Sequence, residues 1–193
     1  MIQIKDLCLT FDNKAVLQNF SLTLPLTGIT ALSGPSGCGK TSLLRCIAGL
    51  EHPQSGEILG ICPEETAFLF QEDRLLPWRT VSQQLTDVLP RERHGETARW
   101  LALAELTEEE ASYPGQLSGG MSRRLALART LALGGALYLL DEPFAGIDPE
   151  RISRLMQALR KLDTPVLLSS HLPVVLAQAD RVIRLDGPPL IIL

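Results

Sequence analysis

The chain of 193 residues has few cysteines and histidines, and it has no long apolar run. Its four cysteines form no CxxC pair and its three histidines are scattered, so the sequence predicts neither a metal cluster nor a disulfide framework. The longest apolar stretch, 130–140, is far shorter than the roughly 20 residues of a membrane-spanning helix. The N-terminus MIQIKDLCLTF alternates and does not form the apolar core of a signal peptide. We therefore expect a chain of a reducing cytosol that does not cross a membrane by itself.

A basic excess is also missing. Lysine and arginine number 18 against 22 aspartates and glutamates, which gives a formal net charge of −4. The sequence therefore excludes a broad positive surface for nucleic acid, and we expect no nucleic-acid partner. A small local site for phosphate remains compatible with this charge.

Segments with the apolar pattern of a strand alternate with segments that have the pattern of a helix along most of the chain. Two alternating segments within 2–24 meet at Asp12-Asn13, which predicts an antiparallel hairpin. Further strands are expected at 28–33, 66–71, 136–140, 165–169 and 181–185, with helices at 41–50, 149–162 and 173–179. This order predicts an α/β fold with a mainly parallel sheet.

A helical stretch interrupts this order between residues 80 and 133, and it is clearest at 98–106 and after Ser118. The length of the chain suits one ordinary domain. We therefore expect a single domain, 1–193, with a core of 1–79 and 134–193 and a helical subdomain of roughly 80–133.

The segment from Gly34 to Thr41 matches GxxxxGK[ST] and lies between a predicted strand and a predicted helix. Its glycines let backbone N–H groups turn toward phosphate oxygens, and the helix N-terminus adds partial positive charge. Lys40 can reach the β- and γ-phosphates of a nucleotide, and the Thr41 hydroxyl can bind Mg²⁺. The predicted phosphate-binding residues are Gly34, Pro35, Ser36, Gly37, Cys38, Gly39, Lys40, Thr41 and Ser42. A glycine-rich turn that matches by chance is the weaker interpretation, because both flanking elements are in place.

The apolar strand at 136–140 leads into two carboxylates, Asp141 and Glu142. A buried strand of a parallel sheet delivers Asp141 to the same edge as the phosphate loop, where it can hold Mg²⁺. Glu142 can accept a proton from a water that attacks the γ-phosphate. An acidic turn without function is the alternative, and the phosphate loop disfavours it.

The segment Leu117-Ser118-Gly119-Gly120-Met121 closely resembles the LSGGQ signature of ABC ATPases. Other landmarks of this family occur in the expected order, namely Phe11, Gln71, Gly146-Ile147-Asp148 and Ser170-His171. The resemblance implies a P-loop nucleotidase core with a mainly parallel sheet, an N-terminal antiparallel β subdomain and an inserted α-helical subdomain.

The resemblance also implies a homodimer that sandwiches two ATP molecules head to tail. Ser118, Gly119 and Gly120 open a helix, and their N–H groups would form an anion site facing the phosphate loop of a second copy. Asp148 would shape the dimer contact. The alternative for the signature is a serine helix cap followed by small residues, with Arg123 and Arg124 solvated.

The same resemblance assigns the remaining roles. Glu142 would be the general base, and His171 would position the water through the γ-phosphate, unless it only caps a helix. Phe11 would stack on adenine. The implied catalytic residues are Lys40, Gln71, Glu142 and His171, and the implied Mg²⁺ ligands are Thr41, Gln71 and Asp141. Met121 replaces the usual signature glutamine, which leaves room for a nucleotide-binding regulatory module without turnover.

The stretch 71–81, QEDRLLPWRTV, resembles that of importer ATPases for nitrate, sulfonate and taurine. This implies ATP-driven import through a separate membrane permease, with an extracytoplasmic solute-binding protein and a peripheral location on the cytoplasmic face. Leu75, Leu76 and Trp78 either line a groove for the permease or pack inside the subdomain. The chain ends soon after its last predicted strand, so no C-terminal regulatory domain is expected. An exporter subunit and a non-transport ABC protein of DNA repair or ribosomes are the alternatives.

Overall fold

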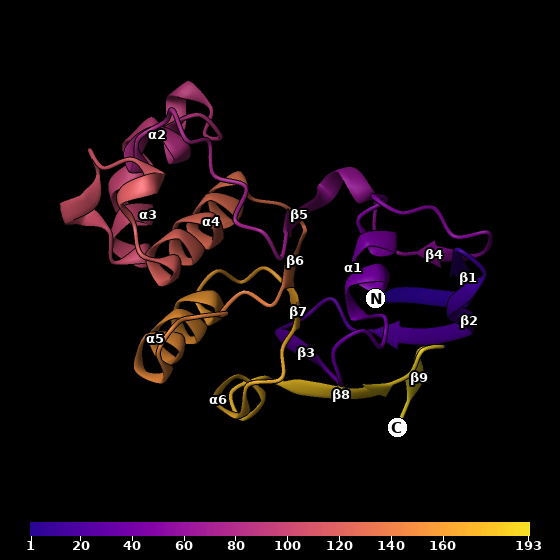
Figure 1. Ribbon diagram of the computed structural model, residues 1–193. Helices are drawn as coiled ribbons and strands as arrows, with labels where there is room; N and C mark the ends of the chain where they lie inside the picture. The colour runs from indigo at the N-terminus through magenta and orange to yellow at the C-terminus, as the bar shows by residue number, and fades with distance from the viewer.

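The computed structural model describes residues 1–193, whose strands form two sheets (Figure 1). The smaller sheet is antiparallel and comprises β2 (Lys14–Leu24), β1 (Ile2–Phe11) and β4 (Ser55–Leu59), in that order. Asp12 and Asn13 have φ values of 44° and 65° in the turn, as a two-residue hairpin turn requires. The predicted hairpin is thus confirmed. Strand β4 was not predicted, because four of its five residues are exposed and show no apolar alternation.

The larger sheet has six strands in the order β5-β6-β7-β3-β8-β9. The first five run parallel, as predicted, and only β9 is antiparallel to its neighbour. Their bounds are β5 (Thr66–Leu69), β6 (Leu137–Asp141), β7 (Val166–Ser169), β3 (Ile29–Ser33), β8 (Arg181–Asp186) and β9 (Ile191–Ile192).

Strand β6 shows why the strands of the larger sheet have nearly continuous apolar sequences. All five of its residues are buried. Leu137 and Leu139 belong to the apolar cluster that also holds side chains of β1, β2 and α1 (Lys40–Ile47). Tyr138 and Leu140 belong to a second cluster on the opposite face of the sheet. A strand covered on both faces needs apolar residues at every position.

Three helices follow the strands of the parallel sheet, namely α1, α5 (Pro149–Arg160) and α6 (Pro173–Leu176). They end two or three residues earlier than predicted, which is the usual uncertainty of helix ends. Three more, α2 (Val81–Thr86), α3 (Thr97–Ala104) and α4 (Gly119–Leu133), gather away from the antiparallel sheet (Figure 1). Short 3-10 helices lie at Pro63–Glu65, Arg91–Glu96, Thr107–Glu109 and Pro114–Gln116.

The protein thus has the predicted fold class, with an antiparallel sheet, a mainly parallel sheet and a group of helices between β5 and β6. None of its helices combines the length and the apolar character that crossing a membrane requires. The exact bounds of the helical subdomain stay a prediction.

Candidate functional site

A cleft of about 790 Å³ opens where the parallel strands reach their carboxyl ends. The loops after β3, β5, β6 and β7 all contribute to it, which is where ligands bind in sheets of this kind. Its volume suits a small organic ligand. The lining residues are Val16, Gly34, Pro35, Ser36, Gly37, Gly39, Lys40, Thr41, Ser42, Gln71, Asp141, Glu142, Ala145 and His171.

The predicted phosphate loop forms one wall of this cleft. A Cβ on Gly34 would lie 2.3 Å from the carbonyl oxygen of Leu185, so only glycine fits there. Gly39 takes a φ of 119° as the chain turns into α1. Lys40 is 8% exposed, and its ammonium donates to the carbonyl oxygens of Gly34 (2.9 Å) and Pro35 (2.8 Å). The loop therefore presents backbone amides and a held cation to the cleft. Cys38 is fully buried and does not line the cleft, so its contact with phosphate stays a prediction.

Asp141 lies at the end of β6 with both carboxylate oxygens engaged. Its Oδ2 accepts a hydrogen bond from Thr41 Oγ1 at 2.7 Å, and its Oδ1 accepts one from Ser169 Oγ at 2.6 Å. Gln71 lines the same cleft. A hydroxyl, a carboxylate and an amide thus offer the oxygen ligands that Mg²⁺ prefers, so the predicted metal-binding residues fit this ion.

Glu142 follows on a strained backbone, with a φ of 46° that residues other than glycine rarely adopt. Its N–H donates to Ser169 Oγ at 2.8 Å, and its Oε1 lies 3.3 Å from His171 Nδ1. The His171 side chain is 71% exposed. It does not cap α6, since no side chain accepts a hydrogen bond at that helix start. The structure thus brings Glu142 and His171 together at the cleft.

The sequence did not predict roles for Arg123 and Ser169, although both contact Asp141 and Glu142. The alternative interpretation of the signature placed Arg123 and Arg124 in solvent, but they are only 3% and 7% exposed. Helix α4 is buried on most sides, so its sequence carries no apolar stripe that would reveal an inward side chain. Ser169 reads as an ordinary strand residue, and only the pairing of β6 with β7 puts it opposite Asp141. Val16 and Ala145 also line the cleft, and nothing in the sequence pattern around them indicated this.

Several predicted ligand residues do not line the cleft of a single chain. Ser118 caps α4 by accepting a hydrogen bond from the N–H of Met121, and Gly119 is exposed beside it. A Cβ on Gly120 would lie 2.9 Å from the carbonyl oxygen of Gly146, so this glycine brings two loops close together. Phe11 is 41% exposed at the end of β1. None of these residues lines the cleft of a single chain.

Asp148 caps α5 and pairs with Arg151. It accepts hydrogen bonds from the Arg151 backbone N–H at 3.0 Å and from its guanidinium at 2.6 Å. The same backbone and guanidinium contacts lower the pKa of Asp148 to about 2. The carboxylate is therefore ionised at neutral pH, and Asp148 is exposed at the start of α5.

Leu75, Leu76 and Trp78 were expected either to line a surface groove for the permease or to pack inside the helical subdomain. Leu75 packs against the core on the side of the helical group. Leu76 is 36% exposed and Trp78 is 68% exposed. Packing inside the subdomain therefore applies to Leu75, and the surface interpretation applies to Leu76 and Trp78.

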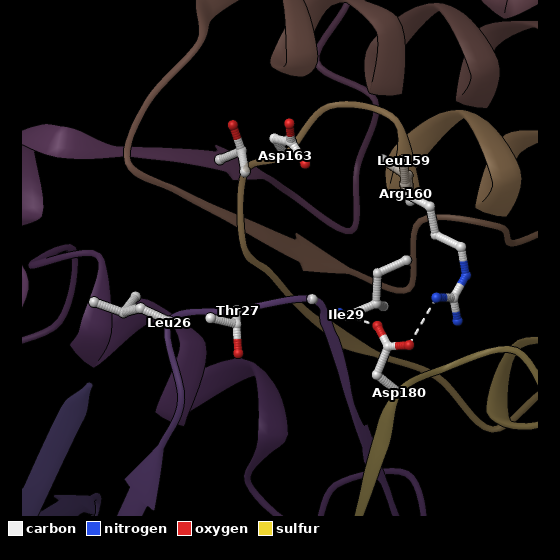
Figure 2. A pocket seen from close by; sticks show the side chains of 9 residues that line it. Leu26, Thr27, Ile29, Leu159, Arg160, Asp163 and Asp180 are labelled. Carbon is white, nitrogen blue, oxygen red and sulfur yellow. Dashed lines mark hydrogen bonds and ion pairs between the residues drawn. The ribbon is translucent and has the colours of Figure 1, made fainter.

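A second cavity, of about 270 Å³, lies at the opposite edge of the sheet, where β3 begins (Figure 2). Figure 2 shows Asp180 between Ile29 and Arg160. Asp180 accepts hydrogen bonds from the Ile29 N–H at 2.8 Å and from the Arg160 guanidinium at 2.7 Å. These contacts join β3, α5 and the start of β8, and none of the predicted site residues lies here. We assign this cavity a structural role.

Comparisons with known proteins agree with this geometry. The family model described as ABC transporter matches residues 17–145. The chain is 39% identical, over 98% of its length and 79% of the relative's, to the aliphatic sulfonates import ATP-binding protein SsuB 2 of Rhizobium johnstonii. It is also 39% identical to the sulfate/thiosulfate import ATP-binding protein CysA of Vibrio vulnificus, over 88% of this chain and 54% of that one.

Solved structures give the same result. The dimeric structure of MJ0796, a bacterial ABC transporter cassette, is 26% identical with a TM-score of 0.87, covering 96% of this chain and 94% of that one. A dimeric post-hydrolysis state of the same ATP-binding cassette, bound to ADP and Pi, has a TM-score of 0.86 at 26% identity, covering 100% and 99%.

Proposed function

Because this chain belongs to the ABC transporter family of ATP-hydrolysing cassettes, we propose that it powers import of a small solute through a separate membrane permease. One observation carries the proposal. A single cleft gathers the phosphate loop, Asp141, Glu142 and His171, which are the groups that binding and hydrolysis of a nucleoside triphosphate require. The named functions of the relatives, import of aliphatic sulfonates and of sulfate or thiosulfate, favour an oxyanion such as a sulfonate, taurine or nitrate as cargo.

In this proposal the phosphates of ATP lie over the loop from Gly34 to Ser42, where the backbone amides and the N-terminus of α1 favour negative charge. Lys40 exchanges its contacts with the loop carbonyls for the β- and γ-phosphates. Thr41, Gln71 and Asp141 would hold Mg²⁺, which would neutralise charge on the phosphate oxygens. Phe11 stacks on the adenine with its exposed ring.

Glu142 is the general base. Its carboxylate accepts a proton from a water as the water oxygen bonds to the γ-phosphorus. The bond between that phosphorus and the bridging oxygen breaks, so ADP and inorganic phosphate are released. His171, whose Nδ1 lies 3.3 Å from Glu142 Oε1, contacts the γ-phosphate and orients the water. Gln71 helps to orient the same water from the loop after β5.

We further propose that the working unit is a homodimer with two ATP molecules at its interface. Ser118, Gly119 and Gly120 of one copy then contact the γ-phosphate held by the other, which agrees with the exposure of Ser118 and Gly119 outside the cleft of a single chain. Asp148 lies at this interface. The MJ0796 cassette is dimeric in both of its solved structures, which supports the arrangement.

Closure of this dimer on ATP and its reopening after hydrolysis would drive the permease. Leu76 and Trp78 would contact the permease as an exposed apolar patch. The chain would therefore lie on the cytoplasmic face of the membrane, and an extracytoplasmic solute-binding protein would deliver the cargo.

The test is Glu142→Gln with Glu150→Gln as a matched control, because the Glu150 side chain is 84% exposed on α5. Loss of the base is expected to lower kcat by about 10²–10⁴-fold with ATP affinity retained and an ATP-bound dimer in size-exclusion chromatography. The control is expected to turn over ATP normally. Normal hydrolysis by Glu142→Gln would refute the assignment of the base.

Two further measurements separate the rival functions. Lys40→Ala is expected to weaken ATP binding itself, and an unchanged Kd would count against the phosphate-loop role. Capture of tagged Glu142→Gln from native membranes with ATP and Mg²⁺ is expected to recover a polytopic membrane protein. Recovery of soluble partners alone would favour a non-transport ABC ATPase.

A further inference from the structure

Arg123 lies on α4, one turn inside the helix that Ser118 caps, and its side chain is 3% exposed. The guanidinium joins two strand ends of the catalytic cleft. Toward β5, Nη1 donates to the carbonyl oxygens of Phe70 at 2.8 Å and Gln71 at 3.1 Å. Toward β6, Nη2 donates to those of Asp141 at 2.5 Å and Glu142 at 2.9 Å, and Nε reaches Glu142 at 3.2 Å.

Burying a guanidinium here requires partners for its charge and for its donors. The charge is matched by Asp73, whose Oδ1 lies 3.1 Å from Nη1. Four backbone carbonyl oxygens accept hydrogen bonds from the guanidinium N–H groups. A rigid planar fork can reach both strand ends at once, whereas a lysine ammonium is a single point charge. The contacts therefore depend on arginine at this position.

The contacts also explain how Glu142 keeps its strained backbone. A φ of 46° persists only where surrounding groups over-determine it. Arg123 holds the carbonyl of Glu142, and Ser169 holds its N–H. The main chain is thus fixed on both sides of the carboxylate, which then meets His171 at the cleft.

From this geometry we propose that Arg123 is a positioning residue for ATP hydrolysis. It holds the main chains of Gln71 and Glu142 at one fixed spacing and ties both to the helix that begins with the signature segment. The inference rests on the proposed roles of Gln71 and Glu142. It adds that their alignment depends on a buried arginine that contacts neither the nucleotide nor the water.

Arg123→Gln tests this, with Arg124→Gln as the matched control. Arg124 is the next residue of the same helix, is also buried, and donates to the carbonyl oxygens of Ala104 and Glu105, away from the cleft. Misplacing the base is expected to lower kcat of Arg123→Gln roughly tenfold to hundredfold, while the Kd for ATP changes little. The control is expected to keep its kcat per folded molecule. Arg123→Lys, which can keep the contact with Asp73 but not both strand ends, is expected to have an intermediate kcat.

Three results would overturn the inference. They are a native kcat in Arg123→Gln, an equal loss of kcat in both variants, and a loss of ATP affinity in place of kcat. If Arg123→Gln does not fold, Arg123→Lys decides, since a folded lysine variant with native kcat would also overturn it. Loss of hydrolysis in Glu142→Gln with native kcat in Arg123→Gln would leave the proposed function intact and remove this inference alone.

Discussion

The hydroxyl of Ser169 offers a direct test of how the site is held together. It is fully buried between β6 and β7, where it donates to Asp141 Oδ1 at 2.6 Å and accepts from the N–H of Glu142 at 2.8 Å. Ser169→Ala would keep the strand and its packing but remove both hydrogen bonds. The partly buried N–H of Glu142 and a carboxylate oxygen of buried Asp141 would each lose a partner.

An unpaired buried carboxylate oxygen costs about 1–3 kcal/mol and the lost bond to the partly buried N–H about 1 kcal/mol, so Ser169→Ala is expected to lower the unfolding free energy by about 2–4 kcal/mol. That is a large part of the about 5–15 kcal/mol that stabilises an ordinary domain. The strained main chain of Glu142 also loses one of its two anchors. A lower kcat is therefore expected even under conditions where the variant is fully folded.

Urea unfolding with linear extrapolation measures the stability change, and steady-state ATPase assays measure kcat. Ser170→Ala is the matched control, because Ser170 is equally buried but its hydroxyl accepts one bond, from the N–H of Leu172 at 3.2 Å. The control is expected to cost about 1 kcal/mol, the usual net value of one hydrogen bond. Equal losses in the two variants, or native kcat in Ser169→Ala, would refute the reasoning.

Three other predictions concern the rest of the chain. Trp78→Ala is expected to change the unfolding free energy by less than about 0.5 kcal/mol, as exposed sites do, yet abolish co-sedimentation with native membranes; a large loss of stability would contradict this. Burial, with the Glu51 carboxylate, raises the pKa of Cys46 to about 12, so a thiol reagent at pH 8 should modify exposed Cys62 and reach Cys46 only after unfolding in urea. Because the pKa of Asp148 falls from 3.8 to about 2 on folding, its stabilising contribution is present above 3.8 and lost as the pH drops toward 2. Acid titration of Asp148→Asn should lack that part of the transition.

Local pattern was enough to predict the glycine-rich loop between β3 and α1, because its glycines and the lysine that opens the helix follow one another directly in the sequence. It was also enough for the parallel sheet, since β6 and β7 are buried on both faces and consist almost entirely of apolar residues. The resemblance to ABC ATPases placed Gln71, Glu142 and His171 in order along the chain, and the fold brings all three to one cleft.

Only the tertiary structure decided what lies behind and around these residues. Ser169 meets Asp141 through strand pairing, and Arg123 is buried on a helix that is covered on most of its sides. The exposure of Trp78 and the packing of Leu75 likewise depend on neighbours distant in sequence. Sequence spacing determines which groups can occur together on one element. Contacts between elements decide which side chains are buried, because burial and hydrogen-bond partners come from parts of the chain that no local pattern contains.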